Sequence, residues 1–354
     1  MQLPWKIRKP IGDIYSFLHY LIKSIAYRRI NTNKFSNQPT VEFNIPFYGF
    51  TGGGSAILTV ANLISHDFSV SLFTHRTNIF NRYVSRRIKL VTKPSLDRDV
   101  YIMESGTDAT LMGSLLASGR KVIISNHGFI TTAVGAPRNY GYDDKKILFA
   151  LSNASSAHFL SQEQADATMA FCPSIKNARI IPNSVNSVAR HRLNHGVGIV
   201  CDTTLPLKNV AAAILAAEAS SASSVHVWGR FQDKYSSTRA IWHGFEKDKN
   251  RIYASFDVLV SLSLTETQPL TILEAMSAGI PCVLNDLSCY EFLKDVPGIW
   301  FVETGNIDQA IDAINTALKA DAETRAALIN YWRDHYSPDV AKSAWINYIR
   351  DIVR

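Results

Sequence analysis

The sequence has 354 residues, of which 46% are hydrophobic and 19% are charged. Such a chain has room for two domains and enough apolar residues for folded cores, which excludes extended disorder. The net charge is +7, but residues 1–40 hold seven lysines and arginines against one aspartate, so most of the excess is local. We therefore expect no nucleic acid partner. The 4 cysteines lack metal-ligand spacing, and we find neither a signal peptide nor a membrane-spanning run, which favours a cytoplasmic location.

The basic N-terminal arm, residues 1–40, is predicted to contain one amphipathic helix. Apolar side chains recur at helical spacing over residues 11–26, and lysines and arginines flank this stretch at both ends. Residues 5–30 could lie in an anionic membrane interface, which would place the protein at the inner face of the cytoplasmic membrane. The alternative is a helix that packs on the protein's own body with solvated lysines. Polar residues 31–40 are expected to form a linker.

Residues 41–190 are predicted to form a Rossmann-like domain. Short apolar runs alternate with helical stretches, and this βαβ pattern implies a parallel sheet covered on both faces. The expected strands are residues 42–45, 69–74, 100–103, 121–125 and 157–160. The expected helices are near residues 54–65, 107–118 and 143–153.

A second Rossmann-like domain is predicted over residues 191–325, after a polar, turn-rich hinge at residues 181–195. The expected strands are residues 197–201, 225–228, 258–261 and 282–284. The expected helices are near residues 207–219, 268–278 and 306–319. Two α/β halves joined by a hinge would place a ligand in a cleft between the carboxyl ends of both sheets.

The most informative segment carries two glutamates, Glu266 and Glu274, separated by seven residues. Pro269 suits a first helical turn, because its missing N–H would be unpaired there anyway. The free N–H groups of Leu270 and Thr271 would then form an anion site, reinforced by the helix dipole. Carboxylates bind phosphates poorly but accept hydrogen bonds from sugar hydroxyls. The arrangement predicts a ligand with a diphosphate in the middle and a sugar at each end, a nucleotide-sugar.

A glycine run over residues 51–55 follows the first strand and opens a helix. Glycines such as Gly53 and Gly54 let a backbone approach a phosphate or a sugar closely. The alternative is simply a tight turn between strand and helix. The run lacks G-x-G-x-x-G spacing, and no acidic residue ends the second strand at Thr74, which argues against a dinucleotide-dependent dehydrogenase.

Two further residues are candidates because of their positions after strands. Lys208 follows the first strand of the second half, from where its ammonium could neutralise charge on a departing nucleoside diphosphate. His127 lies at the carboxyl end of the fourth strand of the first half, where an imidazole could bond a hydroxyl of the donor sugar. The alternatives are a solvated loop lysine and a loop histidine whose hydrogen bonds are satisfied.

The segment ETQPLTILEAMSAGIPCV resembles the E-x7-E motif of the retaining glycosyltransferases of family four, which have the GT-B fold. The resemblance covers most of residues 41–350. Residues 181–186 resemble the family's linker, Lys208 its phosphate-binding lysine, and the glycine run its first glycine-rich loop. Residues 326–354 resemble the C-terminal helices that cross back onto the first domain.

The resemblance implies a metal-independent transferase without a cofactor, whose donor substrate is a nucleoside-diphosphate sugar. Glu266 is expected at the hydroxyls of the donor sugar and Glu274 at the ribose of the nucleotide. Lys208 is expected on the diphosphate, and His127 at the donor sugar. The remaining donor contacts are expected from Thr267, Gln268, Pro269, Leu270, Thr271, Gly53, Gly54 and Asn183.

The implied reaction moves a hexose, with retention of configuration, to a hydroxyl of a saccharide or lipid-linked acceptor in bacterial cell-surface polysaccharide or lipopolysaccharide synthesis. One departure concerns the arginine that the family places shortly before its lysine. The positions near Cys201 and Asp202 are not basic, so either Arg230 replaces this arginine or diphosphate binding is weakened. Two alternatives therefore stay open: a catalytically inactive saccharide- or nucleotide-binding protein, and a GT-B nucleotide-sugar epimerase.

Overall fold

The structure is a computed structural model that divides the chain into two compact units. The first unit comprises Met1–Pro182 and Ala341–Arg354, and the second unit comprises Asn183–Val340. The described residues are Leu18 and residues 38–45, 52–75, 77–104, 109–128, 144–189, 194–230 and 239–354. Most of the predicted N-terminal arm, residues 1–40, therefore lies outside the described residues.

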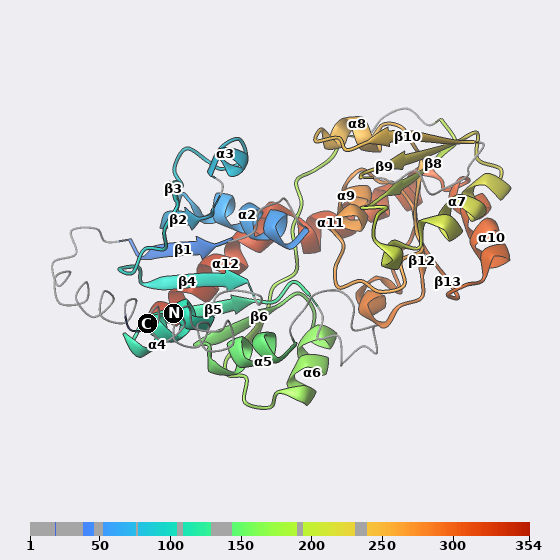
Figure 1. The fold of residues 1–354 in the computed structure, drawn as a ribbon. Helices are drawn as coiled ribbons and strands as arrows, with labels where there is room; N and C mark the ends of the chain where they lie inside the picture. Colours follow the sequence, from blue (N-terminus) through green and yellow to red (C-terminus); the bar gives the residue numbers. More distant parts are fainter. Residues whose placement is uncertain are drawn as a thin grey trace, which may run out of the picture. The chain divides into compact units, whose positions relative to one another are not determined.

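The first unit contains a 7-stranded parallel sheet in the order β3-β2-β1-β4-β5-β6-β7. Figure 1 shows β3, β2, β1, β4, β5 and β6 side by side in this order. Its strands are β1 (Thr40–Asn44), β2 (Ser69–Phe73), β3 (Lys89–Val91), β4 (Val100–Glu104), β5 (Lys121–Ser125), β6 (Ser156–Phe159) and β7 (Ala178–Ile180). The described helices between them are α2 (Gly52–Ile64), α3 (Thr77–Phe80), α4 (Ala109–Ala117), α5 (Asp144–Asn153) and α6 (Gln162–Phe171). The strand order reverses between β1 and β4, and ligands of such sheets bind at the carboxyl ends of these strands.

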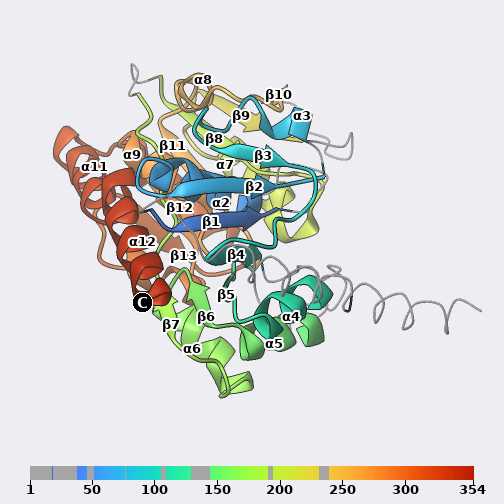
Figure 2. The ribbon, with the colours of Figure 1, turned by 90° about the vertical axis from the view of Figure 1, so that its left-hand side faces the viewer.

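The last helix of the chain, α12 (Pro338–Val353), packs on the sheet of the first unit. Trp345, Tyr348 and Ile349 share one helical face and enter the same buried cluster as α2, β1 and β4. The hydroxyl of Tyr348 lies 2.6 Å from Oγ of Ser156 on β6. Figure 2 shows α12 beside β6 and β7. These contacts fix the C-terminal helix to the unit in which the chain begins.

Glu42, in the middle of β1, is a fully buried acid of the first unit. Its carboxyl group accepts hydrogen bonds from Oγ of Ser71 at 3.0 Å and from the N–H of Ser95 at 3.0 Å. Burial raises its pKa to about 7, because desolvation penalises the charged form more than these bonds favour it. Burial also raises the pKa of Glu104, at the end of β4, to about 7.

We predict that Glu42→Gln flattens the pH dependence of stability in the first unit. A carboxyl group with a raised pKa contributes stability below pH 4.5 that is lost as the pH rises through 7. The expected loss is about 3 kcal/mol for Glu42, and Glu104 adds a second loss of the same sign. Urea unfolding of wild type, Glu42→Gln and Glu323→Gln, an exposed control, at pH 5 and pH 8 tests this. The same change in the free energy of unfolding between pH 5 and pH 8 for all three proteins would contradict the prediction.

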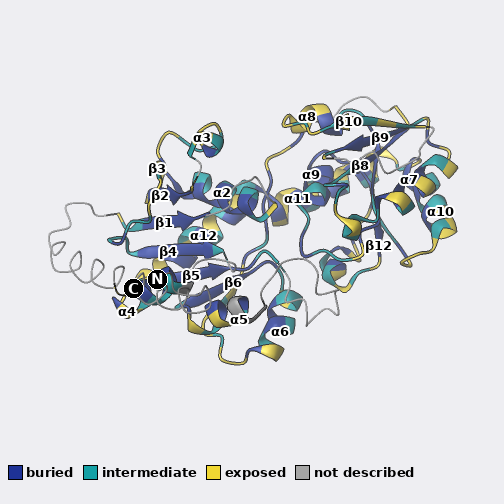
Figure 3. Cartoon of the chain, in the orientation of Figure 1, coloured by how far each residue is buried: buried dark blue, intermediate teal, exposed yellow. Residues whose placement is uncertain are grey.

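The second unit contains a 6-stranded parallel sheet in the order β10-β9-β8-β11-β12-β13. Its strands are β8 (Gly196–Val200), β9 (Ser224–Trp228), β10 (Ala240–Gly244), β11 (Val258–Ser261), β12 (Cys282–Asn285) and β13 (Ile299–Val302). Its described helices are η1 (Pro206–Lys208), α7 (Val210–Ala219), α8 (Lys249–Tyr253), α9 (Leu270–Ser277), η2 (Ser288–Leu293), α10 (Ile307–Ala317) and α11 (Ala322–Tyr336). The strands are mostly buried, while α7 and α10 expose one face (Figure 3).

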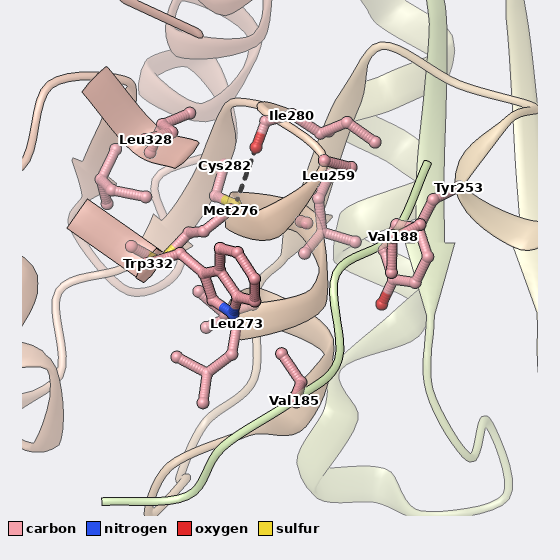
Figure 4. Close-up of a cluster of buried hydrophobic side chains, with 14 of the residues drawn as sticks. Val185, Val188, Tyr253, Leu259, Leu273, Met276, Ile280, Cys282, Leu328 and Trp332 are labelled. Atoms are coloured by element: carbon pink, nitrogen blue, oxygen red, sulfur yellow. Dashed lines mark hydrogen bonds between the residues drawn. The ribbon is translucent and has the colours of Figure 1, made fainter. Parts of the chain in front are cut away.

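The division of the chain differs from the expected one at both ends of the second unit. The first unit ends at Pro182, whereas we predicted the boundary after residue 190. Val185 and Val188 pack with Leu273 of α9 in the core of the second unit, so this stretch belongs there (Figure 4). Trp332 of α11 enters the same cluster, so α11 is part of the second unit, and the first unit takes up the chain again within α12, at Ala341.

No helix in the described part of the chain combines the length and the apolar character that a bilayer crossing requires.

Candidate functional site

The structure brings Lys208 and Glu266 together at the carboxyl edge of the second sheet. Lys208 ends the short turn η1 after β8, and its Nζ forms an ion pair with Oε1 of Glu266 in the loop after β11. The two loops are also joined through the backbone, because the N–H of Leu264 donates to the carbonyl of Leu207 at 2.8 Å. Side-chain exposure is 23% for Lys208 and 11% for Glu266, so the pair is largely shielded from water.

Glu274 lies on α9 and is buried, with 6% of its surface exposed. Its Oε2 accepts a hydrogen bond from the hydroxyl of Tyr253 at 2.7 Å and lies 3.0 Å from Nζ of Lys249. Burial raises the pKa of Tyr253 well above its usual range, so this hydroxyl stays protonated and donates. Among the described residues Oε1 of Glu274 has no partner, so this oxygen can accept a bond from a ligand.

The first turn of α9 lies between the two glutamates in the sequence. The helix begins at Leu270, two residues after the expected start near residue 268, and Pro269 is its N-cap with extended backbone angles. The N–H groups of Leu270 and Thr271 have no carbonyl partner within the helix, because the first turn lacks preceding residues. Open N–H groups at the positive end of a helix dipole favour an anion. This turn therefore has the open N–H groups and the helix dipole that the predicted anion site requires.

Asn183 and Gln268 are held by each other. The N–H of Asn183 donates to Oε1 of Gln268 at 2.6 Å, and Nδ2 of Asn183 donates to the carbonyl of Gln268 at 3.0 Å. Both residues are buried, as is the neighbouring Thr267. These bonds fix the loop between Glu266 and Pro269, so the structure gives Asn183 and Gln268 a role in shaping the site.

The position of the expected arginine is occupied by a tight polar turn. Oδ1 of Asp202 accepts hydrogen bonds from the N–H and the hydroxyl of Thr204 at 3.1 and 2.6 Å. Thr203 is joined to the next loop, because its N–H and its hydroxyl donate to the carbonyl of Arg230 at 2.9 and 2.7 Å. Arg230 is exposed and follows β9, the strand that pairs with β8. The turn thus places an arginine beside the loop that carries Lys208, through a different strand.

In the first unit the structure brings Gly53 and His127 together. A Cβ atom on Gly53 would lie 3.2 Å from Cβ of His127 and 3.0 Å from Oε1 of Glu104, so a side chain at this position would crowd both residues. Gly53 and Gly54 form the first turn of α2 as predicted, and His127 follows β5. The start of α2, the imidazole of His127 and the carboxyl group of Glu104 therefore meet at the carboxyl edge of the first sheet.

Three residues of these clusters were missed by the sequence analysis. Lys249 and Tyr253 precede Glu274 by more than twenty residues and lie in no motif, so the sequence carried no signal for them. Glu104 did carry one, because it directly follows the strand predicted over residues 100–103, as His127 follows another predicted strand. A search for polar residues at the carboxyl end of each central strand would have found Glu104.

Comparisons with known proteins bear on the family and the fold of this chain. Residues 201–320, about a third of the chain, match the family model of glycosyl transferases group 1. A search of curated proteins found no match. Among solved structures, HepE from Anabaena in complex with UDP-glucose has a TM-score of 0.70 at 13% identity, covering 88% of this chain and 99% of that one. The fold is the GT-B fold.

Two further GT-B structures show the same similarity. Sucrose-phosphate synthase from Thermosynechococcus elongatus has a TM-score of 0.73 at 10% identity, covering 89% of this chain and 99% of that one. The lipopolysaccharide outer core galactosyltransferase WaaB has a TM-score of 0.65 at 16% identity, covering 88% and 99%. The predicted pair of Rossmann-like domains is confirmed, and the family match together with the GT-B fold supports a glycosyltransferase.

Proposed function

We propose that the protein is a retaining, metal-independent glycosyltransferase that moves a sugar from a nucleoside-diphosphate sugar to a hydroxyl of a saccharide or lipid-linked acceptor. The observation that carries this proposal is the grouping within the second unit of a lysine–glutamate pair, an open helix turn and a buried glutamate with one free oxygen. They are Lys208, Glu266, the first turn of α9 and Glu274.

Each part of a nucleotide-sugar has a matching group. The diphosphate binds Nζ of Lys208 and the N–H groups of the first turn of α9, since both favour negative charge. Glu266 then exchanges its ammonium partner for hydroxyls of the donor sugar. Glu274 accepts a hydrogen bond from the ribose through Oε1, while Tyr253 and Lys249 hold Oε2 in place. Arg230 supplies a further positive charge near the diphosphate.

The reaction breaks the bond between the anomeric carbon and the diphosphate oxygen. The bonding electron pair leaves with the diphosphate, and the sugar acquires oxocarbenium character. Lys208 and the amides of α9 stabilise the charge that develops on the leaving group. An acceptor oxygen forms the new bond on the same face of the sugar, and its proton passes to the departing phosphate. The charged groups of this step all come from the second unit.

The setting we propose is the synthesis of bacterial cell-surface polysaccharide or lipopolysaccharide on the cytoplasmic side of the membrane. The GT-B fold is shared with WaaB, a lipopolysaccharide galactosyltransferase, and with HepE, whose structure contains UDP-glucose. The basic residues of the arm, which number seven between residues 1 and 40, would hold the enzyme near anionic lipids and a membrane-bound acceptor.

A thermal-shift panel tests the donor site. We expect one of UDP, GDP, ADP and TDP to raise the melting temperature, because a ligand that binds only the folded state stabilises it by mass action. Glu274→Gln keeps the volume of the side chain but removes the negative charge that pairs with Lys249. We expect this substitution to weaken the binding of this nucleotide by roughly ten- to hundredfold. The exposed Glu323→Gln is the matched control and should bind as wild type does.

Product analysis then separates the remaining functions. Transfer to an acceptor with retained anomeric configuration, seen by NMR of the product, is the expected result. Binding of a nucleotide-sugar with no turnover for any acceptor would favour a binding protein. Formation of an epimerised nucleotide-sugar without acceptor would favour an epimerase. No shift with any nucleoside diphosphate would overturn the donor site itself.

A further inference from the structure

A chain of hydrogen bonds runs through the first unit behind His127. Nε2 of His127 lies 2.9 Å from Oγ of Ser125, the last residue of β5. The same Oγ lies 2.8 Å from Nδ1 of His158 on β6, and Nε2 of His158 lies 2.8 Å from the carbonyl oxygen of Ile181. These hydrogen bonds thus join four residues from three neighbouring segments of the unit.

The direction of every bond in this chain follows from its last member. The carbonyl of Ile181 can only accept, so Nε2 of His158 carries a hydrogen and donates it. A neutral His158 then has a bare Nδ1, which must accept the hydrogen of the Ser125 hydroxyl. Because that hydrogen is used, Ser125 can only accept from His127, whose Nε2 must therefore be protonated. A neutral His127 is left with a bare Nδ1.

Both imidazoles are held neutral by their surroundings. Burial lowers the pKa of His127 to about 3 and that of His158 to about 4. The first turn of α2 lies against His127 through Gly53, and the positive end of a helix disfavours a second positive charge. Trp345 of α12 lies against His158, with ring centroids 4.6 Å apart. The acid beside this cluster is Glu104, whose own pKa is raised to about 7 by burial.

The chain of hydrogen bonds ends at an acceptor that has no donor. Nδ1 of His127 is buried and has no hydrogen-bond partner among the described residues. The residue as a whole is partly exposed, at the carboxyl edge of the sheet. A buried acceptor that stays unpaired is unfavourable, so this atom indicates a ligand that brings a donor. A sugar hydroxyl provides one, whereas a phosphate or carboxylate oxygen would repel the bare nitrogen.

We propose that Ser125 and His158 are positioning residues, which fix the tautomer of His127 so that its Nδ1 accepts a hydrogen bond from a hydroxyl of a sugar at the carboxyl edge of the first sheet. The identity of the ligand as a sugar rests on the function proposed above, while the tautomer rests on the hydrogen-bond chain alone. The two parts therefore call for two separate measurements.

The first measurement is nitrogen-15 NMR of the histidine rings in the full chain without ligand, with His127→Gln to assign the signals. We expect His127 in wild type to carry its hydrogen on Nε2. Ser125→Ala removes the acceptor of that hydrogen and should give a mixture of tautomers, while Ser125→Thr keeps the hydroxyl and should restore one form. His226 and His243 of the second unit are internal references. A hydrogen on Nδ1 of His127 in wild type, or no effect of Ser125→Ala, would overturn the proposal.

The second measurement compares two ligands, a nucleoside diphosphate and the same diphosphate carrying its sugar. We expect Ser125→Ala to lower kcat/KM for the nucleotide-sugar about tenfold, the size of one neutral hydrogen bond. Affinity for the bare diphosphate should not change, and Ser125→Thr should recover most of the activity. Equal losses for both ligands, or no loss for either, would overturn the role in sugar binding. If wild type binds no diphosphate at all, the proposed function fails, and the NMR result still decides the tautomer.

Discussion

Replacing Gly229 by alanine should destabilise the second unit by about 4 kcal/mol or more, an exceptional loss for a single methyl group. Gly229 follows β9 with a φ of +126°, and a Cβ atom there would lie 1.8 Å from the carbonyl oxygen of Cys201. That oxygen is backbone and cannot rotate away as the end of a side chain could. The N–H of Gly229 also donates to the carbonyl of Gly244 at 2.9 Å, so the turn is held from a second side.

Gly305→Ala separates the clash from the cost of the backbone conformation. Gly305 has a φ of +90°, and no atom lies within 4 Å of its Cβ position. Its substitution should cost only the strain of a positive φ, about 1–2 kcal/mol. Urea unfolding of wild type and both variants measures the difference. Similar small losses for the two variants would mean that the turn between β9 and the loop of Cys201 adjusts, and the prediction would be wrong.

Gly229→Ala should also affect the candidate site. The loop of Cys201 leads to Thr203, whose N–H and hydroxyl are bonded to the carbonyl of Arg230. The same loop continues into η1, which carries Lys208. A shift of the Gly229 turn would therefore move both positive charges that we assign to the diphosphate. A variant that still folds should bind a nucleoside diphosphate more weakly than Gly305→Ala does.

The central strands could be predicted from the sequence because they are buried on both faces. β5 (Lys121–Ser125) and β11 (Val258–Ser261) have the predicted bounds, since continuous apolar runs identify such strands. β10 (Ala240–Gly244) was missed: it is an edge strand whose residues are exposed or only partly buried, and its apolar run ends after three residues, at Trp242. β3 and β7 have three residues each and were missed for the same reason.

The candidate site was predictable where it depends on spacing along the chain. The pairing of Lys208 with Glu266 was not part of the prediction. Lys208 was named because it follows a strand, and Glu266 because seven residues separate it from Glu274. The contacts of Tyr253 and Lys249 with Glu274 depend on how α8 packs against α9. A helix of five residues, such as α8, is too short to give a clear periodic pattern in a sequence. Sequence periodicity reports burial, whereas such side-chain contacts need the coordinates.

Lys208→Met should reduce kcat for sugar transfer by roughly 10²- to 10³-fold, which is typical when one stabilising group of a developing charge is lost. Methionine keeps the apolar stem of the side chain and removes its ammonium group. The leaving diphosphate then keeps the amides of α9 and Arg230 but loses the ammonium group of Lys208. Steady-state kinetics with the nucleotide-sugar identified by the thermal-shift panel measures the effect.

The matched control is Lys342→Met, which removes an ion pair of similar geometry outside the site, because Nζ of Lys342 lies 3.0 Å from Asp67 in the first unit. It should leave kcat unchanged, whereas Lys208→Arg should keep part of the activity, since a positive charge remains on a different stem. Loss of the ion pair also frees Glu266, so an effect confined to the KM of the donor would assign Lys208 to ground-state binding. A kcat within twofold of wild type would show that the charge on the leaving group is stabilised elsewhere, with the first turn of α9 and Arg230 as the remaining candidates.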